Sequence, residues 1–251
     1  MAAASLCMES EMKTEMHETS EVKVRTGIAR LAGAMYLLTM STALFAEGYV
    51  RGSLLDGDSA TLTAQNIVQS SLLFRLGIAA DLITATGVVI LVWSLHQLLK
   101  PVDARLALLG AFFRLVEIGI HFSAIVFSVI AVSLLSGSEY TRAFEAQQLH
   151  SLAGFVLRAQ GAGLNIGFIP LGIGSAIFAL LLFRSGYVPR VLAGWGVFAS
   201  LLLATYAFGS IVAPSVRDFF ILGMVPMFVY EVTLGSWLLL TGTAARAPLV
   251  V

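Results

Sequence analysis

The chain has 251 residues, of which 58% are hydrophobic and 12% are charged, and its formal net charge is zero. About a quarter of the residues in a soluble domain are charged, so a chain this poor in charge could not cover a surface that faces water. The neutral balance gives no basic footprint for nucleic acid. The single cysteine, Cys7, excludes a disulfide within the chain and a cysteine metal cluster. We therefore expect an all-α integral membrane bundle whose main partner is the lipid bilayer.

The first 26 residues are polar and mix acidic with basic side chains. No apolar run of about 7–15 residues follows a basic start, so this segment is not a secretory signal peptide. A composition of this kind buries too little apolar surface to fold alone. We predict a disordered cytoplasmic tail over residues 1–26, a membrane domain over 27–242 and a short cytoplasmic tail over 243–251.

Six apolar stretches are each long enough to cross a bilayer, which takes about 20 helical residues. They cover residues 27–49, 71–99, 106–136, 163–183, 191–213 and 219–240. In the first loop, Gly57-Asp58-Ser59 has the pattern of a turn followed by a helix N-cap, so a short helix is predicted over 60–69. Glu47 lies at the outer end of the first span, where we expect water to reach it.

Residues 141–162, between the third and fourth spans, are apolar on one face. Gln147, Ser151 and Arg158 lie on another face. This pattern favours a short amphipathic helix at the outer membrane surface. The alternative is that these residues form an early, tilted start of the fourth span.

The third span carries three polar residues in its first half, Arg114, Glu117 and His121. Their spacing of three and then four residues places them within roughly 60° of one another on a helix. A charged side chain near the bilayer centre costs about 2.5–3.5 kcal/mol on insertion scales and usually faces the bundle interior. We predict that Arg114 pairs with Glu117. The pair either fixes helix packing alone or forms part of a ligand or proton site.

Two further acidic residues lie within spans, Asp81 in the second and Glu231 near the middle of the sixth. Asp81 is about 120° from Arg75 around the helix, so we expect it to find a donor on another helix. Glu231 is a second acceptor within reach of a buried arginine. The candidate ligand-binding centre therefore comprises Arg114, Glu117, His121, Glu231 and Asp81.

Short segments along the whole membrane domain share a pattern with a known family. They are 29–33 (ARLAG), 73–77 (LFRLG), 111–117 (AFFRLVE) and 184–190 (RSGYVPR), with 100–102 (KPV) and 230–231 (YE). Together they resemble the uncharacterised bacterial membrane family catalogued as domain-of-unknown-function 4386. The resemblance covers residues 26–242 and implies a polytopic inner-membrane protein. It implies no activity and no catalytic residue, although Arg114, Glu117 and Glu231 match polar positions of the pattern.

Basic residues set the expected orientation, because cytoplasmic loops of membrane proteins are enriched in Lys and Arg. The tail and the loops at 100–105 and 184–190 hold more of them than the loops on the opposite side. We therefore predict that both termini are cytoplasmic and that the protein lies in the bacterial inner membrane.

The buried polar groups support hypotheses from three classes. The first is a protein that binds or transports a small molecule through a polar centre; transport by so small a protein would call for a homodimer. The second is a structural or regulatory membrane protein whose polar residues only specify packing. An intramembrane enzyme is the weakest, because Asp81 is the only aspartate within a span and no serine has an evident histidine partner. No cofactor or metal is predicted, since His96, His121 and His150 lie at unmatched depths. Convergence of the polar groups on one centre favours the first hypothesis.

Overall fold

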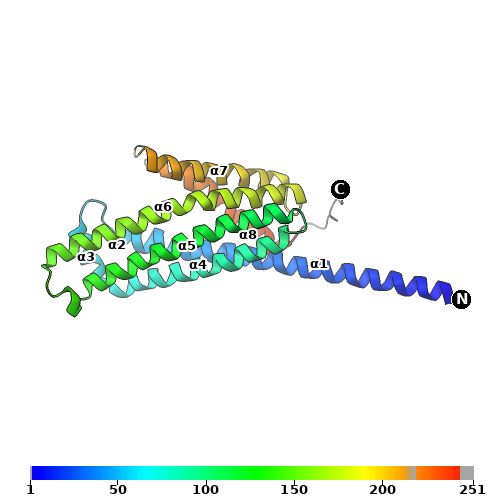
Figure 1. The fold of residues 1–251 in the computed structure, drawn as a ribbon, viewed down its shortest axis with the longest axis horizontal. Coiled ribbons are helices and arrows are strands. Elements are labelled where there is room, and N and C mark those ends of the chain that lie inside the picture. The colour runs from blue at the N-terminus through cyan, green and yellow to red at the C-terminus, as the bar shows by residue number, and fades with distance from the viewer. Residues whose placement is uncertain (1, 214, 216–218, 244–251) are drawn as a thin grey trace.

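The computed structural model describes residues 2–213, 215 and 219–243, and these residues form helices and turns without any strand (Figure 1). The short elements are η1 (Leu44–Arg51, a π-helix), α2 (Gly52–Leu54), α3 (Ala60–Gln69) and η2 (Glu139–Thr141). The long helices are α1 (Ala2–Ala43), α4 (Ser71–Leu99), α5 (Ala104–Leu135), α6 (Ala146–Ser185), α7 (Arg190–Val212) and α8 (Phe220–Thr241).

Six helical stretches in the described residues are long and apolar enough to cross a membrane. They are Val22–Leu54, Ser71–Leu99, Ala104–Leu135, Ala146–Ser185, Arg190–Val212 and Leu222–Thr241. The prediction of an all-α membrane bundle with six spans is confirmed. The first span is longer than predicted, because η1 and α2 continue α1 without a break beyond residue 49.

The long helices form a closed ring in which each one packs against two neighbours. The order around the ring is α1, α4, α5, α6, α7 and α8, and α8 closes it by packing on α1. Gly33 and Gly235 permit this closure: a Cβ atom at Gly235 would lie 2.8 Å from the Cβ atom of Tyr36. Small residues at such contacts let helix backbones approach closely. In this order α5 and α8 lie on opposite sides of the ring.

The N-terminal segment differs from its prediction. Helix α1 extends back to Ala2 and projects from one end of the bundle, where an irregular tail was expected over 1–26 (Figure 1). The physical reason is that Ala, Met, Glu and Lys, which are strong helix formers, dominate the segment. The boundary at residue 26 stays a prediction, and the predicted tail over 243–251 lies outside the described residues from 244 onward.

The outer helix predicted over 141–162 does not exist as a separate element. Helix α6 runs unbroken from Ala146 to Ser185, with Glu145 and Gln148 forming a capping box at its start, so the alternative of an early start of the fourth span is correct. Its first turns pack on α3. The Arg158 guanidinium donates to the Gly57 carbonyl oxygen at 2.9 Å.

The predicted helix over 60–69 is confirmed as α3, and the Ser59 hydroxyl caps it by accepting from the Leu62 amide at 3.1 Å.

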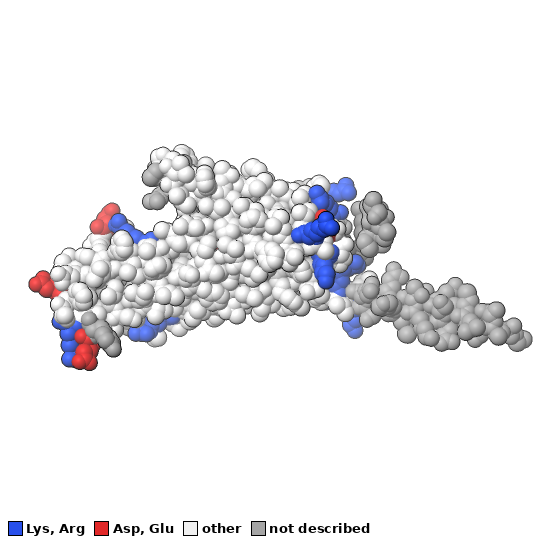
Figure 2. Space-filling view, in the orientation of Figure 1, with Lys and Arg blue, Asp and Glu red and all other residues white. Residues whose placement is uncertain are grey.

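Charged side chains gather at the two ends of the bundle, and a broad uncharged band separates them (Figure 2). The end from which α1 projects shows mainly Lys and Arg, whereas the opposite end shows both signs of charge (Figure 2). We call the first end the basic end; it carries the loops at 100–105 and 184–190. The uncharged band is the surface expected to face the hydrocarbon of a bilayer.

Candidate functional site

The depth of each buried polar side chain can be counted along its helix. The hydrocarbon core is about 30 Å thick, or about 20 residues of helix. Counted from the basic end, Glu117 of α5 and Glu231 of α8 lie near the middle of that layer. Asp81 of α4 lies about 27 Å and Ser128 of α5 about 36 Å from the basic end, on either side of the opposite edge of the layer. The buried polar residues therefore form two groups at different depths.

The inner polar centre is the group near mid-membrane. It consists of Arg114 and Glu117 from α5, Ser175 from α6, Glu231 from α8 and Tyr36 from α1, all at least nine-tenths buried. The Arg114 Nη1 atom donates to the Ser175 hydroxyl at 3.4 Å. Gly174 makes room for the arginine, because a Cβ atom there would lie 2.9 Å from the Arg114 Cγ atom.

The predicted pair of Arg114 and Glu117 forms, but loosely. The Arg114 Nε atom lies 3.7 Å from the Glu117 Oε2 atom, which is ion-pair range without hydrogen-bond contact. The Glu117 Oε2 atom is buried and has no hydrogen-bond partner among the described residues. A buried acceptor left unsatisfied in this way destabilises a fold by about 1–3 kcal/mol, and more when charged. The pair is therefore poorly explained as a device for stability alone.

Glu231 enters the same centre from the opposite side of the ring. The charges of both Arg114 and Glu117 act on its carboxyl group, and its own charge acts on the Tyr36 hydroxyl. Glu231 makes no hydrogen bond to any residue that the structure describes. Among the described residues Arg114 is ion-paired with Glu117 and not with Glu231, so two buried carboxyl groups accompany one guanidinium and leave the centre with an excess of one negative charge when both are ionised.

The outer polar cluster is the second group, and it is tightly bonded. The Arg51 Nη1 atom donates to the Glu47 Oε1 atom at 3.0 Å, and its Nη2 atom donates to the Asp81 Oδ2 atom at 2.5 Å. The same Nη2 atom contacts the Ser128 hydroxyl at 3.1 Å. The Gln160 Nε2 atom donates to the Glu47 Oε1 atom at 3.2 Å. The cluster therefore ties η1, α4, α5 and α6 together.

Arg51 is the residue that sequence reasoning missed, because it was placed in the first outer loop. The π-helix η1 continues the first span and brings Arg51 inward, so that only 5% of its surface is exposed. The four-residue spacing of Glu47 and Arg51 was the available signal, since such pairs share a helix face. The expectation for Glu47 was incomplete: 42% of its side chain is exposed, yet it bonds Arg51 and Gln160.

The five predicted residues do not all converge. Arg114, Glu117 and Glu231 come together in the inner centre, whereas Asp81 belongs to the outer cluster, where Arg51 supplies the donor that it was expected to need. His121 lies between the two groups, half-buried on the same stripe of α5, and the charges of Asp81, Arg51 and Arg114 act on it. A ligand-binding role for these residues stays a prediction.

Comparison with known proteins places the chain by family alone. The family described as Domain of unknown function (DUF4386) matches residues 31–242, which is most of the chain. No curated protein and no solved structure matches. The match includes both polar groups and the six membrane spans except residues 22–30 of the first span.

Proposed function

This multi-pass membrane protein belongs to the DUF4386 family, and we propose that it binds a small cationic molecule in its inner polar centre. The observation that carries the proposal is that two buried carboxyl groups accompany one guanidinium: Glu117 lies 3.7 Å from Arg114, Glu231 is ion-paired with no described residue, and neither carboxyl group is satisfied by hydrogen bonds from the described residues. Uncompensated charge near mid-membrane is expensive and rarely retained without a role.

The chemistry of the centre favours a positively charged group on the ligand. A cation placed between the two carboxylates would balance the excess negative charge and supply hydrogen-bond donors to the Glu117 Oε2 atom. The Tyr36 hydroxyl and Ser175 hydroxyl add neutral polar partners on two other helices. The proposed ligand is therefore a small amine or other compact cation, with Glu117 and Glu231 as its direct partners and Arg114 as the group that positions them.

A purely structural role is the second candidate, and the outer polar cluster favours it. There the Arg51 guanidinium is bonded to two carboxylates and a hydroxyl, so little bonding capacity remains for a ligand. Interactions of this kind join helices and fix their register. If the inner polar centre is also purely structural, adding a cation will not raise the unfolding temperature.

Thermal unfolding of the purified protein in a nonionic detergent tests the proposal. The protein is titrated at constant ionic strength with ammonium, putrescine and choline chlorides, against sodium chloride as the baseline. At least one of the three cations is expected to raise the unfolding temperature in a saturable way, because a ligand that binds only the folded state stabilises it. Glu231→Gln should abolish that rise, whereas Glu145→Gln, a change at an exposed helix cap, should leave it intact. A rise that persists in Glu231→Gln, or no saturable rise with any of the cations, would contradict the proposal.

We also propose that the basic end faces the cytoplasm of a bacterial cell and that both termini lie on that side. The excess of Lys and Arg at this end supports it (Figure 2). Gly242 lies against Thr26, so the two ends of the membrane domain emerge together. Reporter fusions after Asp58, Asp103, Glu139, Tyr187 and Val216 should report outside, inside, outside, inside and outside. A cytoplasmic signal from the Glu139 fusion would overturn this orientation.

A further inference from the structure

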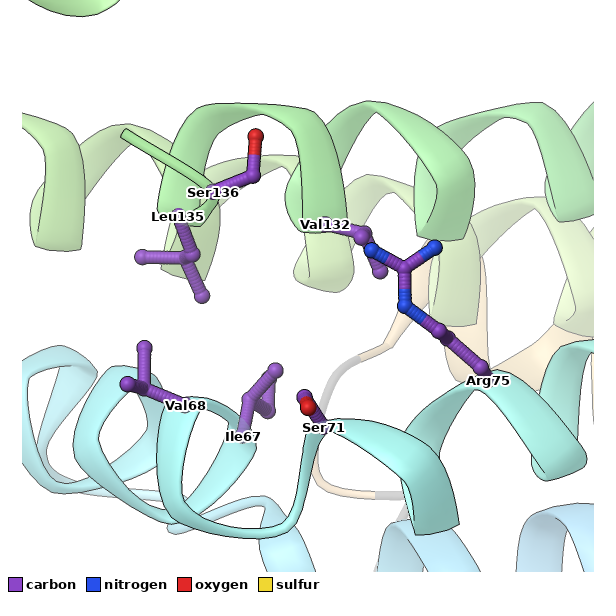
Figure 3. Close-up of a pocket in the computed structure, with 7 residues that line it drawn as sticks. All are labelled: Ile67, Val68, Ser71, Arg75, Val132, Leu135 and Ser136. Atoms are coloured by element: carbon purple, nitrogen blue, oxygen red, sulfur yellow. The ribbon is translucent and has the colours of Figure 1, made fainter. Parts of the chain in front are cut away.

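A cavity of about 230 Å³ lies at the end of the bundle opposite the basic end, apart from both polar groups. It opens where α3, α4 and α5 meet, and its walls are apolar: Ile67 and Val68 from α3, and Val132 and Leu135 from α5 (Figure 3). Ser71, Arg75 and Ser136 complete the lining. The cavity is thus an apolar recess with a single charged side chain.

The charged side chain, Arg75, points across the cavity toward α5 (Figure 3). It makes no ion pair and no hydrogen bond with any residue that the structure describes, in contrast to Arg51 and Arg114. Ser71 lies one helical turn before it on the same face of α4, and its hydroxyl is likewise not hydrogen-bonded within the described part of the chain. A free guanidinium and a free hydroxyl therefore face one recess.

The depth of the cavity suits contact with lipid headgroups or with solutes outside the membrane. Arg75 is near the start of α4, roughly 7 Å beyond the edge of the hydrocarbon layer when about 20 residues are counted from Leu99. A guanidinium there needs an anionic partner or water. The volume is below the roughly 300 Å³ of sites for drug-sized ligands, so one headgroup or one short-chain molecule fills it.

We propose that this cavity binds an amphipathic anion. Its oxyanion, a phosphate or a carboxylate, accepts hydrogen bonds from the Arg75 guanidinium and the Ser71 hydroxyl, and its apolar part packs against Ile67, Val132 and Leu135. Arginine is well suited to this role, because its planar donors match the geometry of carboxylate and phosphate groups. The oxyanion is supplied either by an anionic phospholipid of the outer leaflet or by a free short-chain acid.

Binding of two probes to the full-length protein in nonionic detergent tests the proposal. Binding of dioleoyl phosphatidylglycerol is measured by native mass spectrometry, and binding of octanoate is measured by titration calorimetry. Loss of a charge-assisted hydrogen bond lowers affinity by about tenfold or more. At least one probe should bind the wild type and weaken by that factor in Arg75→Gln. Val132→Phe, which fills the recess and keeps the arginine, should weaken the same probe. Arg142→Gln changes an exposed arginine at the same end that does not line the cavity, and it should bind as the wild type does.

The probe that responds identifies the source of the anion. Binding of phosphatidylglycerol alone assigns the cavity to a lipid headgroup, and binding of octanoate alone assigns it to a free acid. Equal binding of both probes to all the variants would show unspecific surrounding lipid or detergent, and it would overturn the proposal. The proposal would also be overturned if Arg75→Gln weakened binding and Val132→Phe did not. In that case the arginine would bind the probe at the protein surface, outside the cavity. Size-exclusion profiles and unfolding temperatures equal to those of the wild type establish that the variants are folded.

Discussion

Two arginines are buried in the part of the chain that the structure describes, and their surroundings differ. Arg51 is held by short contacts to Glu47, Asp81 and Ser128, contributed by three different helices. Arg114 has one long hydrogen bond to Ser175 and an ion pair with Glu117 at 3.7 Å. Two equally buried arginines can therefore differ widely in how fully they are bonded.

Depth makes this contrast sharper. The outer polar cluster lies at the edge of the hydrocarbon layer, where a partly exposed side chain such as Glu47 can still reach water. The inner polar centre lies near mid-membrane, where an unsatisfied carboxylate is most costly. The inner polar centre is thus less fully hydrogen-bonded than the outer polar cluster, although unsatisfied charge costs more at its depth. This favours a functional reason for the inner polar centre.

The largest effect is expected from breaking the outer cluster. Asp81→Leu removes the closest partner of Arg51 and should lower the free energy of unfolding by about 3–5 kcal/mol, because it leaves a buried cation underbonded. Unfolding in detergent measures this loss. Asp58→Leu is the control, since Asp58 is an exposed loop residue and the change should stay within about 0.5 kcal/mol. A loss below about 1 kcal/mol for Asp81→Leu would mean that Arg51 is satisfied without it.

Double-mutant cycles compare the two arginines directly. The coupling energy between Arg51 and Asp81 should be about 2–3 kcal/mol, and that between Arg114 and Glu117 about 1 kcal/mol, because only the first pair is hydrogen-bonded. Each cycle uses leucine at both positions, and unfolding is measured for the singles and the double. Arg114→Leu with Glu117→Leu should be more stable than the sum of the single losses predicts. Equal coupling in both pairs would remove the contrast between them.

Within the outer cluster, Gln160→Leu should have a smaller effect. It removes one hydrogen bond to Glu47 while the contact of Glu47 with Arg51 remains. The expected loss of unfolding free energy is about 1 kcal/mol, the usual contribution of one hydrogen bond. Gln147→Leu is the control: it makes the same substitution at an exposed position of the same helix, where it removes a hydrogen bond to Thr61, and should cost less. If Gln160→Leu destabilises as strongly as Asp81→Leu, the cluster acts as one cooperative network.

The smallest change in stability is expected from Glu231→Gln. Glu231 is buried, forms no ion pair and receives no hydrogen bond among the described residues, so removing its charge should leave the unfolding free energy within about 0.5 kcal/mol or raise it. The same variant is expected to lose the response to cations. A loss above about 2 kcal/mol would instead identify Glu231 as a structural partner of Arg114, and the inner centre would then resemble the outer one.

Several features of the candidate site could be predicted from spacing along single helices. The proximity of Arg114 and Glu117 follows from a separation of three residues, and the burial of Asp81 and Glu231 follows from their position within apolar spans. The partners on other helices could not be predicted. Arg51 was assigned to a loop because the end of the first span is ambiguous by hydropathy, and a π-helix carries that span further. Likewise, the amphipathic character of residues 141–162 is the same whether the face packs on lipid or on α3.

By itself the sequence determined that this chain is a six-span helical membrane protein with buried charges, because long apolar segments and their interruptions are local properties. Only the tertiary structure decided that α1 and α8 close a ring, with Gly33 and Gly235 allowing their backbones to meet. That closure brings Glu231 of α8 into the ring on the side opposite α5, at the depth of the inner polar centre. The physical reason is that every span is apolar enough to neighbour any other in a bilayer, so the choice of neighbours rests on close packing and on pairing of a few polar groups.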